Sequence, residues 1–502
     1  MSSSSNVREA VKPTHPWLRT IRLAFVPGPI PSLLEEVSSR VLDHVRLQGH
    51  EVQSLPDDDT DVILTTAEFG RVVDWRESLL LSARRRFNLR RTPTVYTMVH
   101  SSTADFQHRL DHLQTALAKG SPEPTDFDFP GLAPQAYRVL FEQGQRGGPI
   151  MALERLVQAQ SKCIRVLLVV GDRWPLVAYH FDLVGGHPRS EGQDPEAFYN
   201  DIILRMVTSV CTREVTEHEV VGESIAYSLW QNLDTPKAMR AAARQLGKRS
   251  FFTELVRIDD LVQVPAVGDA VASQYSEGCF STWDPTLNGL VATVTGSARP
   301  LNKDDVTEDD LAVIVGVRPD GRGAQVRHVT GKENIAPSSE SVEMIGMDGP
   351  LPKISLGTGW ENSAQVPVTR SKLHGHRSIA AYHPTHVEFV PLSPSYYHYL
   401  VSCATDAQAE AVQEAFARSA ALQNPRDPRQ VIFTVLPGHG TVIVEKWVKG
   451  KAPFQIIWEY MDAGYLQVDT RIPQGPMQYI PGSDGRMLLS AVVDNDMSNP
   501  EG

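Results

Sequence analysis

The chain opens with apolar runs that alternate with an amphipathic segment. IRLAFVPG (21–28) is an apolar run that ends at Pro-Gly, and residues 31–50 carry apolar side chains at helical spacing. Three further apolar runs, EVQSL, DVILTTAEFG and TPTVYTMVH, are typical of strands. This strand–helix–strand order predicts a parallel, doubly wound α/β domain over residues 15–120, with ligands favoured at the carboxyl ends of its strands.

A second α/β unit is predicted over residues 121–284. A Pro- and Asp-rich linker, GSPEPTDFDFPGLAP, precedes it, and CIRVLLVVGD (163–172) has the composition of a buried strand. AYHFDLVGG follows as a further strand, and DPEAFYNDIILRMVTSVC has helical spacing. The unit is therefore expected to repeat the α/β character of the first.

The pattern changes from about residue 285. Short apolar runs separated by turn residues continue to residue 492, with one helical stretch at 406–422. Such runs predict a β-rich, barrel-like C-terminal domain. The polar ends, 1–14 and 493–502, are predicted to be a disordered tail and a frayed tail. The predicted fold class is thus α/β, with two doubly wound units followed by a β-rich domain.

Composition and charge exclude several function classes. The chain has 502 residues and a formal net charge of −12, and an acidic surface repels phosphate backbones, so nucleic-acid binding is not expected. No apolar run approaches the roughly 20 residues that span a bilayer, and no secretory signal opens the chain. The four cysteines form no CxxC pair, which fits a reducing compartment. We therefore predict a cytoplasmic protein with no membrane partner.

Candidate chemistry first gathers in QYSEGCFSTWDPTLNGLVATVTGSARP (274–300), at the junction of the second and third segments. Glu277 and Asp284 flank Trp283 in a stretch that is otherwise short of charge. Carboxylates in such a place can bind a hard divalent cation or act as a general base. The simpler alternative is that Asp284, just before Pro285, turns the chain and that Glu277 is solvated.

Histidines form the other two candidates. In KLHGHRSIAAYHPTHVEF, imidazoles at i and i+2, such as His374 and His376, share one face of a strand. With no HExxH motif or cysteine pair nearby, surface histidines in a loop are the simpler interpretation, and a pocket rim that hydrogen-bonds a polyol lies between the two. In LPGHGTVIVEKW (436–447), His439 lies between two glycines, as a hairpin turn or a ligand-presenting loop would place it.

The order of two α/β units and a β-rich domain resembles that of the L-fucose and L-arabinose isomerase superfamily. The segment SEGCFSTWDPTLNGLVATVTGSARP, ending in Thr295-Gly296-Ser297-Ala298-Arg299-Pro300, is similar to that family's acidic residue, small helix and Thr-Gly-x-x-Pro. Gly-Leu-Val stands here where the family has small-Leu-Thr.

The resemblance implies an aldose–ketose isomerase that works on a small polyhydroxylated substrate with Mn²⁺ or a similar divalent cation. It implies Glu254 and Glu277 as catalytic carboxylates and metal ligands, with Asp284 competing for the position of Glu277. His439 corresponds to the family's late metal-binding histidine. We expect Trp283 and His376 to contact the substrate, and enzymes of this type form symmetric homo-oligomers.

Two other functions remain open at this point. One is a non-catalytic sugar-binding or assembly relative of the same fold. The other is a glycosyltransferase-like enzyme built on the first two units. The loop VPGPIP counts against the latter, because it lacks GxGxxG and its prolines remove amide donors that a phosphate cradle uses.

Overall fold

The structure is a computed structural model of the chain. Glu254, Glu277, the linker at 120–134, the segment 295–300 and both terminal tails lie outside the residues it describes. The described residues are 19–28, 32–68, 86–90, 93–119, 148–150, 152–153, 165–181, 189–211, 218–249, 251–252, 278–294, 303, 305–321, 323–332, 336–338, 340–356, 365–393, 406–436, 439–469 and 477–490.

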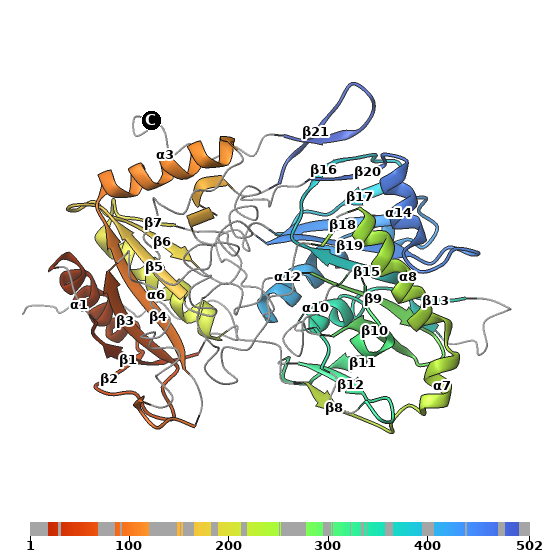
Figure 1. The fold of residues 1–502 in the computed structure, drawn as a ribbon, viewed down its shortest axis with the longest axis horizontal. Coiled ribbons are helices and arrows are strands. Elements are labelled where there is room, and N and C mark those ends of the chain that lie inside the picture. Colours follow the sequence, from red (N-terminus) through yellow and green to blue (C-terminus); the bar gives the residue numbers. More distant parts are fainter. Residues whose placement is uncertain are drawn as a thin grey trace, which may run out of the picture. The chain divides into compact units, whose positions relative to one another are not determined.

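The chain is a mixed α/β protein that divides into two compact units (Figure 1). The first unit comprises Met1–Leu132, Leu153–Leu183 and His187–Thr212. The second comprises Ala133–Ala152, Val184–Gly186 and Arg213–Gly502. No helix in the described ranges is long and apolar enough to cross a membrane.

The first unit is built on a seven-stranded sheet in the order β2–β1–β3–β4–β5–β6–β7. Strands β1 to β5 pair in parallel, whereas β6 and β7 join antiparallel. All six residues of β5 are buried, as expected of a parallel strand covered on both faces. The bounds are β1 Arg22–Val26, β2 Glu51–Gln53, β3 Val62–Glu68, β4 Thr94–Ser101, β5 Arg165–Val170, β6 Val177–Phe181 and β7 Arg189–Glu191.

Helices cover both faces of this sheet. Helices α1 (Ser32–Leu47) and α6 (Pro195–Cys211) contact each other and share one apolar cluster with the sheet, which includes Ala178 of β6. The ring of the next residue, Tyr179, packs at a tilt against that of Phe106 on α3 (Thr103–Lys119), with the ring centroids 5.1 Å apart. Because successive side chains of a strand point to opposite faces, α3 covers the face opposite α1 and α6.

The first predicted α/β domain shares this sheet with the part of the second that ends at Thr212, whereas the residues from Arg213 onward belong to the second unit. Strand β4 lies before the expected boundary at residue 120 and β5 lies after it, yet the two strands pair in register from Tyr96 with Arg165 to Ser101 with Val170. The apolar runs were sufficient to predict the strands. They could not show which strands are neighbours, because a run that is buried on both faces carries no signal of its partner.

The second unit is built on a nine-stranded sheet in the order β17–β18–β19–β15–β9–β10–β11–β12–β8. Most neighbours are antiparallel, and only β8–β12 and β17–β18 are parallel. The described strands form an open sheet and do not close into the predicted barrel. The bounds are β8 Glu219–Val220, β9 Cys279–Asp284, β10 Gly289–Thr293, β11 Leu311–Val317, β12 Ala324–Arg327, β15 Thr369–Gly375, β17 Val387–Phe389, β18 Val431–Leu436 and β19 Gly440–Lys446.

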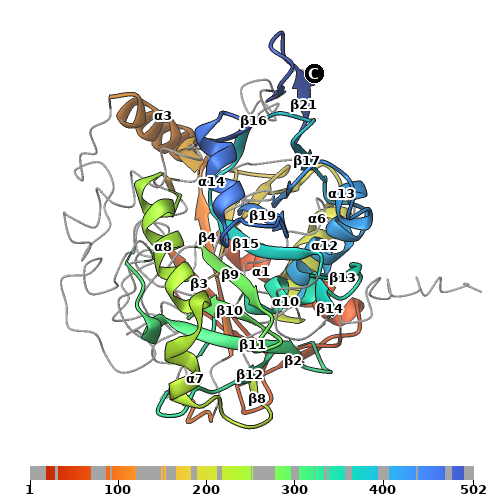
Figure 2. The same ribbon diagram turned by 90° about the vertical axis from the view of Figure 1, so that its right-hand side faces the viewer.

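Each face of this sheet has its own apolar core. One core joins Leu373 of β15 to side chains of α7, α8 and α14, and the other joins Cys279 of β9 to side chains of α10, α12 and α13. Figure 2 shows α8 and α14 on one side of the sheet and α10 and α12 on the other. The bounds are α7 Tyr227–Asn232, α8 Asp234–Lys248, α10 Ser341–Gly346, α12 Asp406–Ala417, α13 Ala420–Gln423 and α14 Gln455–Asp462, with a 3₁₀ turn, η3, at Glu308–Asp310.

Two smaller sheets complete the second unit. β13 (Lys353–Ser355) pairs with β14 (Gln365–Pro367), and a four-stranded sheet has the order β20–β16–β22–β21. Tyr382 of β16 and Leu466 of β20 join the core that contains α14, so the four-stranded sheet packs on that face. The bounds of its strands are β16 Ile379–Tyr382, β20 Leu466–Val468, β21 Tyr479–Pro481 and β22 Met487–Leu489.

Candidate metal centre

Four buried side chains in the second unit form the strongest group of potential metal ligands among the described residues. They are Glu340, His374, His376 and His439. One ligand atom from each lies within 4.8 Å of the other three, and every one of the four residues is buried. Three imidazoles and one carboxylate are a donor set that proteins use for divalent transition metals.

The distances between the ligand atoms of Glu340, His374 and His439 fit a single ion. The Nε2 atom of His374 lies 3.2 Å from Nε2 of His439 and 3.1 Å from Oε1 of Glu340, and Nε2 of His439 lies 3.5 Å from the same Oε1. An ion with bonds of about 2.1 Å separates neighbouring ligand atoms by about 3.0 Å in octahedral and about 3.4 Å in tetrahedral geometry. The three measured separations lie within or next to this range.

The three imidazole rings surround a common centre. The ring centroids of His374 and His439 are 4.6 Å apart, and that of His376 lies 5.4 Å from the first and 4.9 Å from the second. All three pairs meet edge to face, with interplanar angles between 64° and 69°. The Nδ1 atoms of His374 and His439 have no hydrogen-bond partner in the described part of the chain, so the polar contacts of these two rings are made through Nε2.

Strand β15 positions His374. All seven of its residues are buried, because β15 lies between β19 and β9 inside the nine-stranded sheet. His374 pairs with Cys279 on one side and with Val442 on the other. The pleat directs Cys279 and His374 to the face covered by α10 and α12, while Leu373 joins the core on the opposite face.

A close approach of two backbones brings His439 to His374. Gly440, which begins β19, has a φ of +151°, and a Cβ atom there would lie 2.1 Å from the carbonyl oxygen of Gly375. The same Cβ would lie 2.7 Å from the Cα of His376. Only glycine at position 440 permits this approach, which places His439 beside the two histidines of the β15 segment.

Glu340 reaches the centre from the residue before α10. The preceding segment is tied to the end of β10, because the amide of Ser338 donates to the carbonyl of Thr293 (3.0 Å) and Pro337 forms a β-bridge with Val294. The carbonyl of Glu340 then accepts from the amide of Met344 (3.1 Å) and so starts the helix. Backbone contacts on both sides of Glu340 therefore fix its position.

Burial and mutual charge set the ionisation of these ligands. Burial favours the neutral form of Glu340, but the charges and hydrogen bonds of His374 and His439 outweigh it and hold the pKa of this carboxyl well below its usual range. Burial also lowers the pKa of His374, yet the charge of Glu340 reverses this and raises it overall. Burial lowers the pKa of His439 to about 3, so this ring is neutral near pH 7.

Three more ionisable side chains act on the centre. Burial raises the pKa of the Cys279 thiol, which also hydrogen-bonds to Glu340, well above its usual value. Burial raises the pKa of Glu343 to about 8. Lys303 is buried, and its positive charge acts to lower the pKa of both Cys279 and His374.

The structure brings together two of the residues predicted as sites from sequence, His376 and His439. Trp283, predicted to contact substrate, is 9% exposed on β9 and faces the same core as Cys279. Asp284 lies away from the cluster: its Oδ1 accepts from the amides of Thr286 (2.8 Å) and Leu287 (3.0 Å) and so caps the turn between β9 and β10. The remaining two predicted ligands, Glu254 and Glu277, lie outside the described residues.

The sequence alone did not identify Glu340 as a ligand, and it favoured an exposed loop as the location of His374. A loop of surface histidines was the simpler interpretation for His374 and His376, and it is wrong for both, because they are 0% and 4% exposed. The signal that points to the centre is their i, i+2 spacing on one strand face. Glu340 stands in a polar stretch, NIAPSSES, that carries no ligand spacing.

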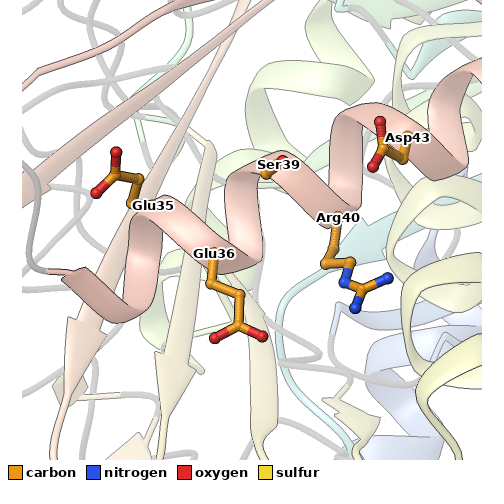
Figure 3. A pocket seen from close by; sticks show the side chains of 5 residues that line it. All are labelled: Glu35, Glu36, Ser39, Arg40 and Asp43. Atoms are coloured by element: carbon orange, nitrogen blue, oxygen red, sulfur yellow. The ribbon is translucent and has the colours of Figure 1, made fainter.

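An open hollow on the first unit has a different character. Figure 3 shows the five side chains that line it, which all project from α1. Each of these residues is exposed, so they do not form a shielded group of converging ligands. They are Glu35, Glu36, Ser39, Arg40 and Asp43.

Comparison with known proteins assigns no family to this geometry. The chain matches no protein-family model and no curated protein. The function is therefore inferred from the buried cluster itself.

Proposed function

We propose that the protein is a metal-dependent enzyme whose one divalent cation is held by Glu340, His374, His376 and His439. The observation that carries this proposal is the convergence of four buried donor atoms within 4.8 Å. Oxygen and imidazole donors without thiolate suit Mn²⁺, and also Fe²⁺, Co²⁺ or Zn²⁺. We propose Mn²⁺ or a similar divalent cation as the resident metal.

The crowding of buried polar atoms supports this assignment. Buried polar atoms are nearly always hydrogen-bonded, and an unsatisfied one costs about 1–3 kcal/mol. Here the Nε2 atoms of His374 and His439 have only each other and Oε1 of Glu340 as polar partners among the described residues. A cation between these atoms would give each lone pair a partner.

We propose aldose–ketose isomerisation of a small polyhydroxylated substrate, through an ene-diol, as the reaction. A divalent ion would supply stabilisation of the negative charge that develops on substrate oxygen. Glu340 would hold the ion, and Glu343, three residues further along the same segment, is the carboxyl best placed to exchange a proton. These two residues take the roles that the family resemblance gives to Glu254 and Glu277.

The strand order of the first unit supports its assignment as a doubly wound α/β domain. The order β2–β1–β3–β4–β5 is one of the two common orders of doubly wound sheets. We infer that the first unit is such a domain, and that it includes the part of the predicted second α/β unit that ends at Thr212.

The complete burial of the four ligands favours a second candidate, a structural metal site. Structural zinc is usually held by four protein ligands in a closed tetrahedral shell, whereas a catalytic ion keeps one position for water or substrate. In a structural site, removal of the metal would unfold the second unit and the bound ion would exchange no water. In an enzyme, the ion would have an exchangeable ligand.

Metal content of the purified protein tests the proposal. Elemental analysis is expected to find about one divalent ion per chain, and calorimetry with Mn²⁺ on the metal-free protein is expected to give one site. His374→Ala is expected to abolish this site, whereas His383→Ala, on a partly exposed turn, serves as the matched control and keeps it. Equal metal binding in the two variants would contradict the metal proposal.

The proposed reaction has its own test. The Mn²⁺-loaded protein is assayed against a panel of pentoses and deoxyhexoses, with His374→Ala as the blank. Ketose formation that depends on the metal supports the isomerase. A fully loaded protein that converts none of these sugars would refute the reaction and leave the metal site standing.

A further inference from the structure

Glu343 is a buried carboxyl beside the candidate metal centre. It is 2% exposed and follows Glu340 by three residues, a spacing that places two side chains on neighbouring positions of one helix face. Its Oε2 accepts a hydrogen bond from the side-chain amide of Gln408 on α12. Its Oε1 has no hydrogen-bond partner in the described part of the chain.

Glu343 interacts electrostatically with two of the ligands. The charges of His374 and Glu340 both act on its carboxyl, and Glu343 in turn acts on His374 and on the Cys279 thiol. Glu343 is nevertheless not one of the four residues whose ligand atoms all meet within 4.8 Å. Its carboxyl therefore interacts with the centre without being one of the four ligands.

The buried Oε1 atom of Glu343 is expected to accept a hydrogen bond from a donor that the described residues do not supply. Leaving a buried acceptor unsatisfied costs free energy, and such atoms in native proteins are almost always hydrogen-bonded. A water or hydroxyl group on a divalent ion is a strong donor, because the ion withdraws charge from its oxygen. Mn²⁺ and Co²⁺ accept more than four ligands, so four protein ligands leave room for one oxygen.

We propose that Glu343 accepts, through Oε1, a hydrogen bond from a water or substrate hydroxyl bound to the ion of Glu340, His374, His376 and His439. This inference rests on the proposed metal site. Gln408 holds the other carboxylate oxygen and so restricts the rotamer of this side chain. Glu343 thereby orients the water that substrate would replace. A catalytic ion has such an exchangeable ligand, whereas a closed structural ion does not.

Cobalt-loaded protein gives a readout that does not depend on turnover. The visible bands of bound Co²⁺ change when its water ligand loses a proton, so a pH titration gives the midpoint for that water. Burial raises the pKa of Glu343 to about 8, and a divalent ion beside it would favour the ionised form. An ionised carboxylate next to the water holds this proton, and its removal should lower the midpoint. Glu343→Gln is expected to shift it down by about one unit or more, a tenfold change in proton affinity, with one Co²⁺ still bound.

Two further variants serve as controls for this test. Glu343→Asp retains the charge and is expected to restore a midpoint near that of the unsubstituted protein, which a purely structural role would not predict. Glu445→Gln makes the same chemical change in a carboxyl on the opposite face of the sheet, paired with Ser371, and is expected to leave the midpoint unchanged.

Three results would overturn the inference. One is an unchanged midpoint in Glu343→Gln, and another is a cobalt spectrum without any titration. The third is loss of Co²⁺ binding in both Glu343→Gln and Glu343→Asp, which would make Glu343 a ligand or a folding residue. Failure of the unsubstituted protein to bind Co²⁺ would instead refute the proposed metal site, and this inference with it.

Discussion

The Nε2 atoms of His374 and His439 lie 3.2 Å apart, although 65 residues separate the two histidines in the chain. Strand pairing between β15 and β19 creates this contact, because Gly375 pairs with Thr441 directly beside it. Two imidazoles that meet inside an apolar core, with Glu340 against both, form a ligand set held by backbone hydrogen bonds on every side.

Removal of His439 should cost most of the metal affinity. His439→Ala deletes one of four ligands, and we expect the dissociation constant for Mn²⁺ or Zn²⁺ to rise by at least about 100-fold, or about 2.7 kcal/mol. Calorimetry on the metal-free protein measures it. His386→Ala, on the partly exposed turn after β16, is the control and should bind metal as the unsubstituted protein does. A His439→Ala protein with unchanged affinity would remove this histidine from the site.

Metal should stabilise the folded chain. A ligand that binds only the native state adds about 2.7 kcal/mol of stability at a free concentration 100 times its dissociation constant. The melting temperature should therefore rise with Mn²⁺ or Zn²⁺ concentration and fall when EDTA is added. Glu340→Gln should melt at a temperature that neither addition changes. The same metal-dependent shift in Glu340→Gln would show that the stabilising ion binds elsewhere.

Gly440 should be irreplaceable for steric reasons. In Gly440→Ala the new Cβ would meet the carbonyl oxygen of Gly375 at 2.1 Å, and backbone on both strands cannot yield without separating β15 from β19. We expect a loss of more than about 3 kcal/mol in unfolding free energy, together with weakened metal binding. Denaturant titration and calorimetry measure the two effects.

Gly450 provides the matched control for this substitution. Its φ is +78°, but a Cβ there would have no atom within 4 Å. Gly450→Ala should therefore show only the cost of a left-handed backbone, about 1–2 kcal/mol, and normal metal binding. If both alanine variants lost the same stability and bound metal alike, close approach of the strands would not be the reason for Gly440.

Glu445 should make stability fall as pH rises. Burial raises its pKa to about 7, from an ordinary value of 4.5. The folded state therefore binds more protons than the unfolded state between about pH 4.5 and 7, so unfolding free energy decreases with pH across this window by about 3 kcal/mol. Glu445→Gln removes this contribution, and the variant should gain stability relative to the unsubstituted protein as pH rises from 5 to 8.

Denaturant titrations at several pH values measure this difference. Glu459→Gln is the control, because Glu459 is a surface carboxyl that pairs with Lys451 at 2.8 Å. Its stability difference from the unsubstituted protein should show no gain between pH 5 and 8. A Glu445→Gln curve parallel to that of the unsubstituted protein would mean that Glu445 is ionised throughout.

The buried ion pair of Lys372 and Asp348 should be sensitive to removal of either partner. Lys372 is 0% exposed and donates to Asp348 and to the carbonyl of Met344. Lys372→Met leaves a buried carboxylate without its cation, and we expect a loss of about 3–5 kcal/mol. Urea unfolding measures it, and Arg46→Ala, which breaks an exposed pair with Asp43, should change stability by less than about 1 kcal/mol.

The double variant distinguishes a charge effect from lost packing. Replacement of both partners, Lys372→Met with Asp348→Leu, removes the isolated charge and should recover at least half of the loss. A double variant as unstable as the sum of the single variants would show that packing, not charge, sets the cost.

Apolar patterning predicted several elements of the fold. The helical spacing at 31–50 corresponds to α1, Ser32–Leu47, and the helix predicted at 406–422 corresponds to α12 and α13. VIFTVL and the run after PGHG are β18 and β19, an antiparallel hairpin in which Leu436 pairs with Gly440. The helices are predictable because burial on one face leaves its period in the sequence. β18 and β19 are buried at every residue, so they appear as continuous apolar runs.

Strand order and the metal ligands could not be predicted in the same way. Glu340 reaches the cluster only because its segment is tied to the end of β10, which local pattern does not encode. His374 lies in a histidine-rich stretch that resembles a loop, and its burial follows from the central place of β15 in the sheet. His439 is both a turn residue and a member of the cluster, so the two interpretations of PGHG were not exclusive.

The most direct test of the account is anomalous diffraction from crystals of the purified protein, collected at the absorption edge of the metal found by elemental analysis. The account predicts one peak among Glu340 Oε1 and the imidazoles of His374, His376 and His439, at about 2.0–2.2 Å from the ligand atoms. A metal-free map, or a peak held by other residues while these four keep their direct contacts, would contradict it.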